Sequence, residues 1–431
     1  MHSTSDRKRF LQQLAAGTAL TALGLGKSLF ARAEGYGEAD SPPSPRHFLD
    51  QDDFWESVRG EFSFGKLIYL NTATLGLMPK AVVAAVNQRM ETLSRGNYAM
   101  DDEARISVAN MLNAKPSEIS LTHNTTEGIN IVAAGLRLRK GDEIVMTDQE
   151  HVGNALPWLH RAKAIGARIS VLQPANTAAE TLDRLNALIT RRTRVFALPH
   201  ITCTDGQVLP AKEIAELARS KGILSFFDGA HGPGMLFPDM REIGCDFYAS
   251  CGHKWLCGPA GTGMLYLRDE MLDRVQAKMV GAYSDTGWEL STKAQTIAPL
   301  VPTAHRFDYG TQNATIEAGM KAAVQFMEDI GFEKIRNRVK ALSGYLQTKL
   351  LERAYVEMLT PTEEASRGGM IGFRIAGKSL KDIEQSPIPK TFRIRLVPES
   401  GSNSIRISTH IFTSHAELDA LVAELDKWMQ G

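Results

Sequence analysis

The stretch with the clearest chemical potential is Ser-Cys-Gly-His-Lys-Trp at positions 250–255. It follows the apolar run Cys245–Ala249, which predicts a buried strand, and a glycine-rich turn comes soon after the lysine. A lysine amine held just beyond a strand end can bind an aldehyde as a Schiff base, provided that a desolvating pocket disfavours its charged form. A solvated lysine after a strand is the plain alternative, so partners of Lys254 elsewhere in the chain have to decide between the two.

A carboxylate follows another apolar run. Asp228 closes the run Ile223–Phe227, and His231 stands three residues later. A carboxylate at such depth is costly unless it is paired. A protonated pyridine nitrogen would be a suitable partner, and the pair would keep the ring an electron sink. The alternative is an aspartate that caps the next turn.

Two hydroxyl-rich turns could bind a phosphate group, and one histidine could cover an aromatic ring. Thr125 and Thr126 stand at a predicted helix start, where free N–H groups and the helix dipole favour an anion. Thr311, in the loop 310–313, could reach the same phosphate, including across a subunit boundary. Either turn can also be an ordinary helix start. His151 follows a predicted strand and could stack on a ring, although a lone histidine is more commonly structural.

The elements that would position these residues alternate between strand and helix. Strands that alternate with helices of about 10–15 residues indicate βαβ units and a largely parallel sheet covered on both faces. In such sheets ligands bind outside the carboxyl ends of the strands, so the turns described above would meet at one edge. No Gly-x-Gly-x-x-Gly follows the early strands, so a dinucleotide site is not expected. The predicted strands are 67–70, 119–122, 143–147, 168–172, 194–199 and 223–228, and the predicted helices are 80–94, 101–113, one starting at 127, 155–165, 180–190 and 210–221.

After residue 311 the pattern changes, which predicts a second, smaller α+β domain. A long helical stretch at 314–355 precedes short predicted strands and a terminal amphipathic helix; these are 370–375, 392–396, 404–408 and 415–429. Residues 36–50 are rich in Ser, Pro and charge, as in a linker. The sequence therefore predicts four parts: an export signal at 1–33, a linker and N-terminal segment at 34–65, a large domain at 66–311 and a small C-terminal domain at 312–431.

Taken together, these motifs resemble the class V (fold-type I) pyridoxal-phosphate family of aminotransferases, cysteine desulfurases and isopenicillin N epimerases, from about residue 66 to the C-terminus. The resemblance implies an α/β fold-type I transferase whose large, mostly parallel domain binds pyridoxal 5'-phosphate. It also implies a homodimer with the active site at the subunit interface. Lys254 would bind the cofactor covalently, Asp228 would hold the pyridine nitrogen and His151 would stack on the ring. The phosphate would be held by Thr125, Thr126, Cys251 and His253, with Thr311 reaching it from the partner subunit. The ring hydroxyl would contact Cys203 and His231, and the substrate would contact Asn71, Asn154 and Arg406.

The departures from the family pattern favour one of its branches. The family often has Asn where Cys203 stands and Gln where His231 stands. The motifs around Lys254 and His231 look closest to the isopenicillin N epimerase-like branch. Desulfurases carry a nucleophilic cysteine on a loop before the substrate arginine, but the corresponding loop, 395–403, has none. The sequence therefore predicts that the protein is not a cysteine desulfurase.

The N-terminus has the order of a secretory signal. Three basic residues at 7–9 precede the weakly apolar run Leu14–Leu25, and Ala-Arg-Ala at 31–33 offers small residues for cleavage. The run is too short to span a bilayer as a mature helix. The order Arg-Lys-x-Phe-Leu resembles the twin-arginine signal, with lysine in place of the second arginine. We expect a periplasmic protein; the alternative is a cytoplasmic protein with a basic amphipathic start.

The amino-acid composition argues against several kinds of binding partner. Lys plus Arg and Asp plus Glu balance at 49 each, so neither a nucleic acid nor an anionic membrane surface is favoured as a partner. No stable membrane anchor is expected. The four cysteines lie between 203 and 257 without a paired CxxC, so neither a disulfide framework nor a metal site is indicated, and we expect buried thiols.

The resemblance implies an enzyme acting at the α-carbon of an amino acid or an amino-acid-bearing peptide. Transamination needs only Lys254 as a base, whereas epimerisation needs a second proton donor that the sequence does not identify. Exported members of this branch, the pyoverdine-maturation enzymes of pseudomonads, modify a secreted siderophore, so periplasmic siderophore tailoring is the first expectation. The alternatives are an isopenicillin N epimerase-like epimerase or racemase, an aminotransferase, a C–S lyase and, from another class, a cofactor-free binding protein.

Overall fold

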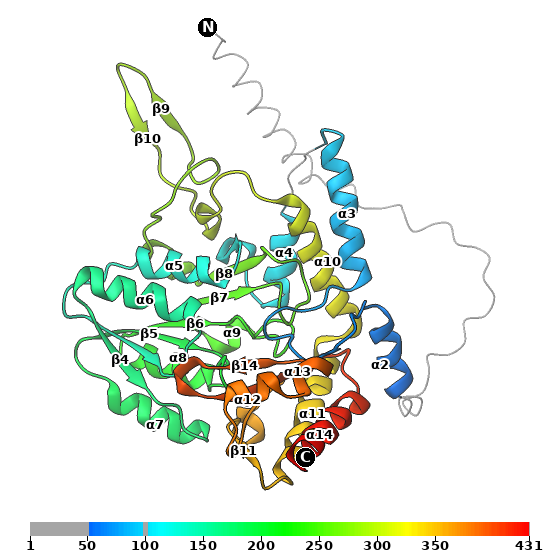
Figure 1. Ribbon diagram of the computed structural model, residues 1–431. Coiled ribbons are helices and arrows are strands. Elements are labelled where there is room, and N and C mark those ends of the chain that lie inside the picture. The colour runs from blue at the N-terminus through cyan, green and yellow to red at the C-terminus, as the bar shows by residue number, and fades with distance from the viewer. Residues whose placement is uncertain (1–50, 98–101, 431) are drawn as a thin grey trace, which may run out of the picture. The chain divides into compact units, whose positions relative to one another are not determined.

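A seven-stranded sheet lies at the centre of the computed structural model, which describes residues 51–97 and 102–430 (Figure 1). The strand order is β2-β8-β7-β6-β5-β3-β4. β8 is antiparallel to both of its neighbours, and β7, β6, β5, β3 and β4 run parallel to one another. The bounds are β2 Ile119–Thr122, β3 Glu143–Thr147, β4 Arg168–Leu172, β5 Thr193–Pro199, β6 Leu224–Asp228, β7 Phe247–Cys251 and β8 Gly263–Leu267. The prediction of a mostly parallel α/β sheet is confirmed.

Helices cover both faces of this sheet, because neighbouring strand residues point to opposite sides. Phe226 packs with Phe247 in one apolar cluster, which α5 and α6 complete. Phe227 packs with Tyr248 in a second cluster, to which α4, α7, α8 and α9 contribute. The helices up to this point are α2 Gln51–Gly60, α3 Lys80–Ser94, α4 Glu103–Met111, α5 Thr125–Gly135, α6 Val152–Ile165, α7 Ala178–Leu188, α8 Ala211–Ser220 and α9 Met240–Ile243.

Two details of the central sheet differ from the prediction. The strand expected at 245–249 is β7 at Phe247–Cys251, because Asp246 belongs to the turn before it: its carboxylate accepts hydrogen bonds from the Ser225 backbone N–H at 2.8 Å and from Arg268 at 2.5 Å. β8 is an additional strand. The glycines before β8 are typical of a turn, so the sequence pattern does not indicate where this strand starts.

A second, four-stranded antiparallel sheet has the order β11-β12-β15-β14. Leucines of α11 and α14 bury the apolar side chains of this sheet in a third cluster. The sheet lies within the residues that we propose as the small domain, 312–431. Its strands are β11 Val356–Met358, β12 Met370–Ile375, β14 Arg395–Val397 and β15 Ser404–Ser408, and the helices here are α10 Ala314–Ile330, α11 Phe332–Leu351, α12 Leu380–Gln385, α13 Ile388–Thr391 and α14 His415–Gln430.

Two predicted elements of this region are each divided in the structure. The helical stretch 314–355 is two helices, α10 and α11, because Gly331 between them adopts φ +98°. The predicted strand 392–396 corresponds to two separate strands. β14 belongs to the small sheet, whereas β13 (Phe392–Arg393) pairs in parallel with β1 (Ile68–Tyr69). α10 packs beside α3 and α4, so the C-terminal third of the chain contacts elements from its start (Figure 1).

A hairpin projects from the rest of the described chain after β8 (Figure 1). Its strands are β9, Trp288–Leu290, and β10, Gln295–Ile297, and they pair only with each other. Trp288, Leu290 and Ile297 are 58%, 74% and 62% exposed. Short 3₁₀ helices lie elsewhere at η2 Pro116–Glu118, η3 Asp269–Arg274, η4 Ala304–Phe307, η5 Glu364–Ser366 and η6 Glu399–Gly401.

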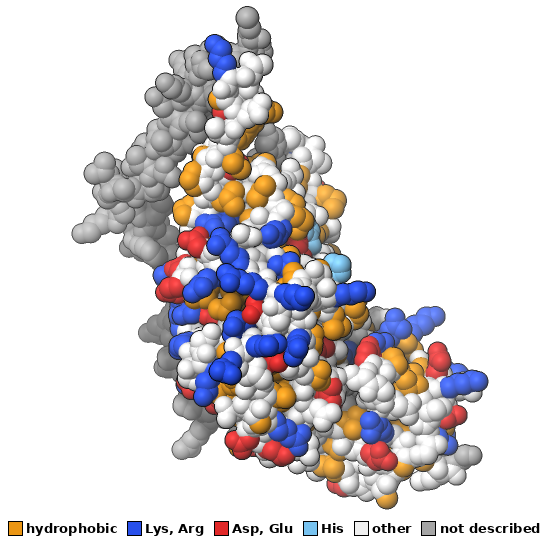
Figure 2. All heavy atoms as spheres, turned by 90° about the vertical axis from the view of Figure 1, so that its left-hand side faces the viewer, with side chains coloured by type: hydrophobic (Ala, Val, Ile, Leu, Met, Phe, Trp, Pro, Cys, Tyr) orange, Lys and Arg blue, Asp and Glu red, His pale blue; other side chains and the backbone are white. Residues whose placement is uncertain are grey.

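On the side of the molecule at the left of Figure 1, Lys and Arg side chains gather across the middle of the surface, with Asp and Glu among them (Figure 2). Within residues 51–97 and 102–430, no helix combines the length and apolar character needed to cross a membrane. The predicted export signal at 1–33 and the linker up to residue 50 lie outside the described residues.

Candidate active site

Lys254 stands on a turn just beyond β7, three residues after the strand ends at Cys251. The lysine is half-buried, whereas Trp255 directly after it is completely buried. Gly76 lies against this turn: its N–H donates to the His253 carbonyl at 2.8 Å, and a Cβ at Gly76 would lie 1.9 Å from the Lys254 carbonyl oxygen. Gly76 was not among the predicted residues, because only this contact explains why position 76 must be glycine.

Asp228 is the last residue of β6, next to the lysine-bearing end of β7. The two strands run parallel with Asp228 opposite Ala249, so their carboxyl ends lie side by side. One carboxylate oxygen accepts from the Ala230 N–H at 2.9 Å, so Asp228 also caps its turn, as the alternative interpretation expected. Burial raises the pKa of Asp228, and the charges of Lys254 and His151 oppose that shift. A buried carboxylate of this kind calls for a cationic partner.

Two buried polar atoms at the start of α5 and on the lysine turn lack partners. Asn124, not a threonine, caps α5 by accepting from the Glu127 N–H at 3.0 Å. Within the described residues, the buried Thr125 hydroxyl and the buried Nδ1 of His253 have no hydrogen-bond partner of ordinary geometry, although the Thr125 hydroxyl lies close enough to the Cys251 thiol to lower its pKa. Buried polar atoms are normally satisfied, so these two point to a polar group that belongs between them. A phosphate at a helix N-terminus fits that requirement.

Two further predicted phosphate contacts, Thr126 and Cys251, lie on α5 and at the end of β7. Thr126, in the first turn of α5, approaches α6 so closely that a Cβ at Gly153 would lie 2.5 Å from its hydroxyl. Cys251 directs its thiol toward the Ala230 carbonyl at 3.6 Å. Burial raises the pKa of the Cys251 thiol, and the charge of Lys254 opposes this, so the neutral thiol is the favoured form. Its single, weak S–H donor is therefore directed at the Ala230 carbonyl.

His151 caps α6 and lies among the charges of the site. Its Nδ1 accepts from the Gly153 N–H at 3.0 Å, so a neutral ring carries its proton on Nε2. Burial, then the charge of Lys254, lowers the pKa of His151, while Asp228 raises it. The imidazole is thus a neutral ring beside the lysine and the aspartate, as stacking on a cofactor requires.

Arg406, on β15, brings the second sheet into the same site. Its Nη1 donates to the Cys203 backbone carbonyl, and its Nη2 donates to the Thr74 hydroxyl at 3.4 Å. Asn71 joins the group because its Oδ1 accepts from the Thr74 hydroxyl at 2.9 Å. Burial lowers the pKa of Arg406 to about 10. Its Nε is buried without a partner in the described chain, which leaves a donor for a substrate carboxylate.

The two positions that depart from the family pattern also lie in this cluster. Burial raises the pKa of the Cys203 thiol to about 12, opposed first by Arg406 and then by Lys254. Burial lowers the pKa of His231 well below its usual value, and the charges of Lys254 and Arg406 act in the same direction. Both side chains are therefore neutral near neutral pH.

Asn154, predicted to contact the substrate, is placed differently. It is completely buried, its Nδ2 donates to the Glu150 carboxylate at 2.7 Å, and its Oδ1 accepts from the Trp158 indole at 3.1 Å. The amide is thus committed to partners within the protein, and we assign it a supporting role instead. The reason is that residue 154 lies in the first turn of α6, on the face packed against the sheet.

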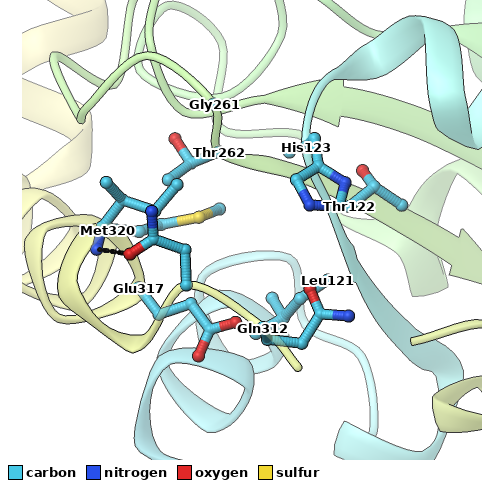
Figure 3. A pocket seen from close by; sticks show the side chains of 11 residues that line it. Leu121, Thr122, His123, Gly261, Thr262, Gln312, Glu317 and Met320 are labelled. Atoms are coloured by element: carbon cyan, nitrogen blue, oxygen red, sulfur yellow. Dashed lines mark hydrogen bonds between the residues drawn. The ribbon is translucent and has the colours of Figure 1, made fainter. Parts of the chain in front are cut away.

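Thr311 also lies apart from the cluster. It is exposed, and in the described residues no hydrogen bond joins it to the phosphate-binding side chains. The next residues, Gln312 and Asn313, line a small pocket that is partly open to solvent. Figure 3 shows the side chains of His123, Thr262, Gln312 and Glu317 around it. Lys254, Asp228 and Arg406 do not line this pocket, but Thr262 does, and its carbonyl accepts from the Gly252 N–H on the lysine turn at 3.0 Å.

The structure adds residues that the sequence did not suggest. Glu150 accepts from the Thr147 N–H at 2.9 Å as well as from Asn154, and burial raises its pKa to about 7. The β14–β15 loop contacts the residue that follows β3, because the Ser400 hydroxyl donates a hydrogen bond to the Asp148 carbonyl. No sequence motif predicts either feature: the pKa of Glu150 depends on its burial, and the Ser400 contact joins segments 252 residues apart.

The cysteines and acidic groups do not form a metal site. All four cysteines are buried and free of disulfides, as predicted for buried thiols. Throughout the described residues, no group of three or more His, Cys, Asp and Glu side chains is arranged to hold a metal ion.

The residues present fit pyridoxal phosphate. The partnerless atoms of Thr125 and His253 fit the phosphate, Asp228 fits a cationic ring nitrogen, and Lys254 lies between them at the end of β7. No other group is required to explain these buried polar atoms. The chemistry of the side chains thus agrees with the cofactor that the sequence motifs imply.

Comparisons with known proteins place the chain in a family. Residues 79–421 match the family described as aminotransferase class-V. The chain is 30% identical over 390 residues to isopenicillin N epimerase of Streptomyces clavuligerus, covering 86% of this chain and 98% of the relative. It is 31% identical over 404 residues to a probable cysteine desulfurase of Xylella fastidiosa, covering 86% and 95%.

Solved structures agree. The cysteine desulfurase CsdA of Escherichia coli superposes with a TM-score of 0.78 at 26% identity, covering 87% of this chain and 98% of CsdA. A C-DES mutant with glycine covalently linked to its PLP cofactor gives 0.76 at 26% identity, covering 86% and 99%. Since desulfurases are among the relatives, the comparisons do not exclude that activity. The chain belongs to the aminotransferase class-V family and is a pyridoxal-phosphate-dependent enzyme with the fold-type I transferase fold.

Proposed function

We propose that the protein reacts at the α-carbon of an amino acid or of an amino-acid-bearing peptide. The observation that carries this proposal is the buried Arg406, whose partnerless Nε lies in the same charged cluster as Lys254 and Asp228. A guanidinium grips a carboxylate with two parallel N–H groups. A carboxylate held there would place the attached α-carbon next to the lysine amine.

Each side chain of the site has its own role in the proposed reaction. Bound pyridoxal phosphate supplies a ring that withdraws electrons from the α-carbon. Asp228 keeps the ring nitrogen positively charged, and Thr125 and His253 hold the phosphate end in place. Lys254 then takes the α-proton and returns it as a general base and acid. Arg406 orients the substrate so that its α-hydrogen faces this amine.

The test is to incubate the cofactor-loaded enzyme with α-amino acids in D₂O. Exchange of the α-proton together with inversion at the α-carbon, seen by chiral chromatography, supports epimerisation, and keto acid formation supports transamination. Arg406→Ala should suppress either reaction by raising KM. If no α-amino carboxylate exchanged its proton or gave a product, action at the α-carbon would be refuted.

Cleavage of a C–S bond is the second candidate, and the relatives favour it. One related structure is described as the cystine C–S lyase C-DES in complex with its product cysteine persulfide, at 25% identity, a TM-score of 0.76 and 84% coverage of this chain. The loop before Arg406 presents Ser400 and no cysteine, and the four cysteines are buried. We therefore propose that any C–S cleavage proceeds without a persulfide on that loop. Release of sulfide or persulfide from cysteine or cystine would support this candidate, and a persulfide formed on the enzyme itself would support a desulfurase.

We also propose that the protein is exported and modifies a secreted metabolite such as a pyoverdine-type siderophore. The support is the order of residues 1–33, which has the basic, apolar and small-residue parts of an export signal. A periplasmic enzyme of this family would meet amino groups of exported peptides. Incubation with a siderophore precursor and mass analysis of its side chains tests this idea, and an unaltered precursor would argue for a different substrate.

A homodimer is proposed as the working form. Thr311 is exposed and not bonded to the phosphate-binding residues of its own chain, which suits a contact made to a second copy. The exposed apolar side chains of the β9–β10 hairpin would be buried by such a copy. Sedimentation of the cofactor-loaded enzyme tests this, and a monomer that keeps full cofactor affinity would contradict it.

A further inference from the structure

His231 has a hydrogen-bond partner that determines where its proton lies. The Trp255 indole N–H donates to Nδ1 of His231 at 3.0 Å. An indole nitrogen can only donate, so Nδ1 must accept and cannot carry a proton. A neutral imidazole then carries its single N–H on Nε2. In the described residues no hydrogen bond reaches that Nε2, although the side chain is only 3% exposed.

We propose that Trp255 is a positioning residue that holds His231 as the neutral Nε2–H tautomer, so that His231 presents one fixed N–H donor to the cofactor. The proposal rests on the proposed function, because it assigns the free N–H of His231 to the cofactor site. The neighbouring charges agree with a neutral ring. Lys254, Arg406, His151 and His253 all act against a positive charge on His231, and burial does so most strongly.

Trp255 is itself held so that its N–H cannot turn away. Its side chain is completely buried, and its carbonyl accepts from Nε2 of His410 at 2.9 Å. The ring lies 5.5 Å from the His410 ring, centroid to centroid, and a Cβ at Gly369 would come within 2.7 Å of the indole. Because Trp255 directly follows Lys254, one buried side chain fixes both the turn that carries the lysine and the proton of His231.

This arrangement gives a reason for the departure at position 231, where the family often has glutamine. A glutamine amide always offers an N–H, whereas a histidine offers one at Nε2 in only one of its two neutral tautomers. The indole N–H removes the other tautomer. In this chain Trp255 and His231 together therefore supply the donor that a glutamine supplies alone.

The first test needs neither cofactor nor turnover. ¹⁵N NMR of the cofactor-free protein with labelled histidine should show Nδ1 of His231 unprotonated and Nε2 protonated, with His231→Gln identifying the signal. In Trp255→Phe, which keeps a buried aromatic ring, the signal should become that of a tautomer mixture. Trp158→Phe removes another buried indole N–H, which donates to Asn154, and should leave the signal unchanged. A protonated Nδ1 in the wild type would overturn the proposal even if the Trp255 variant did not fold.

The second test separates tautomer control from packing. Titration of the cofactor-free protein with pyridoxal phosphate should show weaker binding for Trp255→Phe, by the inverse of the Nε2–H fraction seen by NMR, about twofold for an equal mixture of tautomers. In a His231→Gln background the same substitution should change affinity little, because the amide needs no tautomer control. An equal loss in both backgrounds would mean that Trp255 only packs. If the wild type bound no cofactor, the proposed function would fail, while the NMR result would still decide the tautomer.

Discussion

The guanidinium of Arg406 donates a hydrogen bond to the backbone carbonyl of Cys203, a residue 203 positions earlier in the chain. This bond joins β15 of the small sheet to the loop that follows β5 of the large sheet. It occupies one end of the guanidinium and leaves Nε without a partner in the described chain. Arg406 is therefore already oriented before any substrate arrives.

Arg406→Ala should raise KM for carboxylate substrates far more than it lowers kcat. A buried charged partner removed from a bound carboxylate costs on the order of 2–5 kcal/mol. Steady-state kinetics with one substrate as the acid and as its amide measures this. Arg184→Ala, which removes an exposed arginine of α7, is the control. An unchanged KM would remove Arg406 from the substrate site.

Thr125→Val should have opposite effects on stability and on cofactor binding. The buried hydroxyl has no partner in the described cofactor-free chain, so its replacement by a methyl group should leave the free energy of unfolding unchanged or raise it. Pyridoxal phosphate should bind about 10- to 150-fold more weakly, because a hydrogen bond to a charged group contributes about 1.5–3 kcal/mol. Urea unfolding and cofactor titration measure the two quantities.

The matched control for that variant is Thr181→Val. The Thr181 hydroxyl is equally buried but is bonded, because it accepts from the Ala175 N–H at 2.9 Å and donates to the Thr177 carbonyl at 2.9 Å. Its loss should destabilise the protein by about 1–3 kcal/mol and leave cofactor affinity unchanged. If Thr125→Val instead destabilised the protein as Thr181→Val does, the phosphate assignment of that hydroxyl would be wrong.

Lys254→Ala should abolish covalent attachment of the cofactor. Borohydride treatment of the wild type, digestion and mass spectrometry should find the cofactor mass on the peptide that contains residue 254, and the variant should show none. Lys212→Ala removes an exposed lysine of α8 and should label like the wild type. Labelling of the Lys254 variant at another lysine would show that the cofactor is attached to that lysine instead of Lys254.

The buried imidazole of His410 should make the protein less stable in acid. Burial lowers the pKa of His410 from 6.5 to about 4. Between these values the unfolded chain binds a proton that the folded chain does not, so stability is complete above pH 6.5 and falls as the pH drops towards 4. The contribution is about 3 kcal/mol.

Urea unfolding of the cofactor-free protein at several pH values measures this effect. His410→Gln keeps a donor for the Trp255 carbonyl and should reduce the loss of stability between pH 6.5 and 4 by about that amount. His160→Gln, which removes an exposed imidazole of α6, should retain the full loss. Identical curves for wild type and His410→Gln would contradict the prediction.

Replacement of Arg7 and Lys8 by glutamine should keep the protein in the cytoplasm. The basic pair is the part of the proposed signal that the twin-arginine pattern requires. Cell fractionation of tagged wild type and variant measures the distribution. Replacing Arg32 near the proposed cleavage site, outside the basic pair, is the control and should leave export unchanged. Equal export of all three forms would refute the signal.

Much of this protein could be determined from its sequence because the relevant signals are local. Alternating apolar strands and helices predicted the parallel sheet, in which Lys254 and Asp228 were expected at the same edge; the structure shows that their strands are neighbours. Strand β15 was predicted at 404–408, whereas the expected role of Arg406 on it came from the resemblance to the family.

Only the tertiary structure decided how these residues are supported. Trp255 donates to His231, the Cys203 carbonyl accepts from Arg406, and Gly76 packs closely against the Lys254 carbonyl. No spacing in the sequence reveals these contacts. The amide of Asn154 was misassigned for the same reason, since burial against the sheet commits it to Glu150 and Trp158. A motif specifies which chemical groups follow a strand, whereas burial and distant contacts specify which atoms remain free and which protonation state they hold.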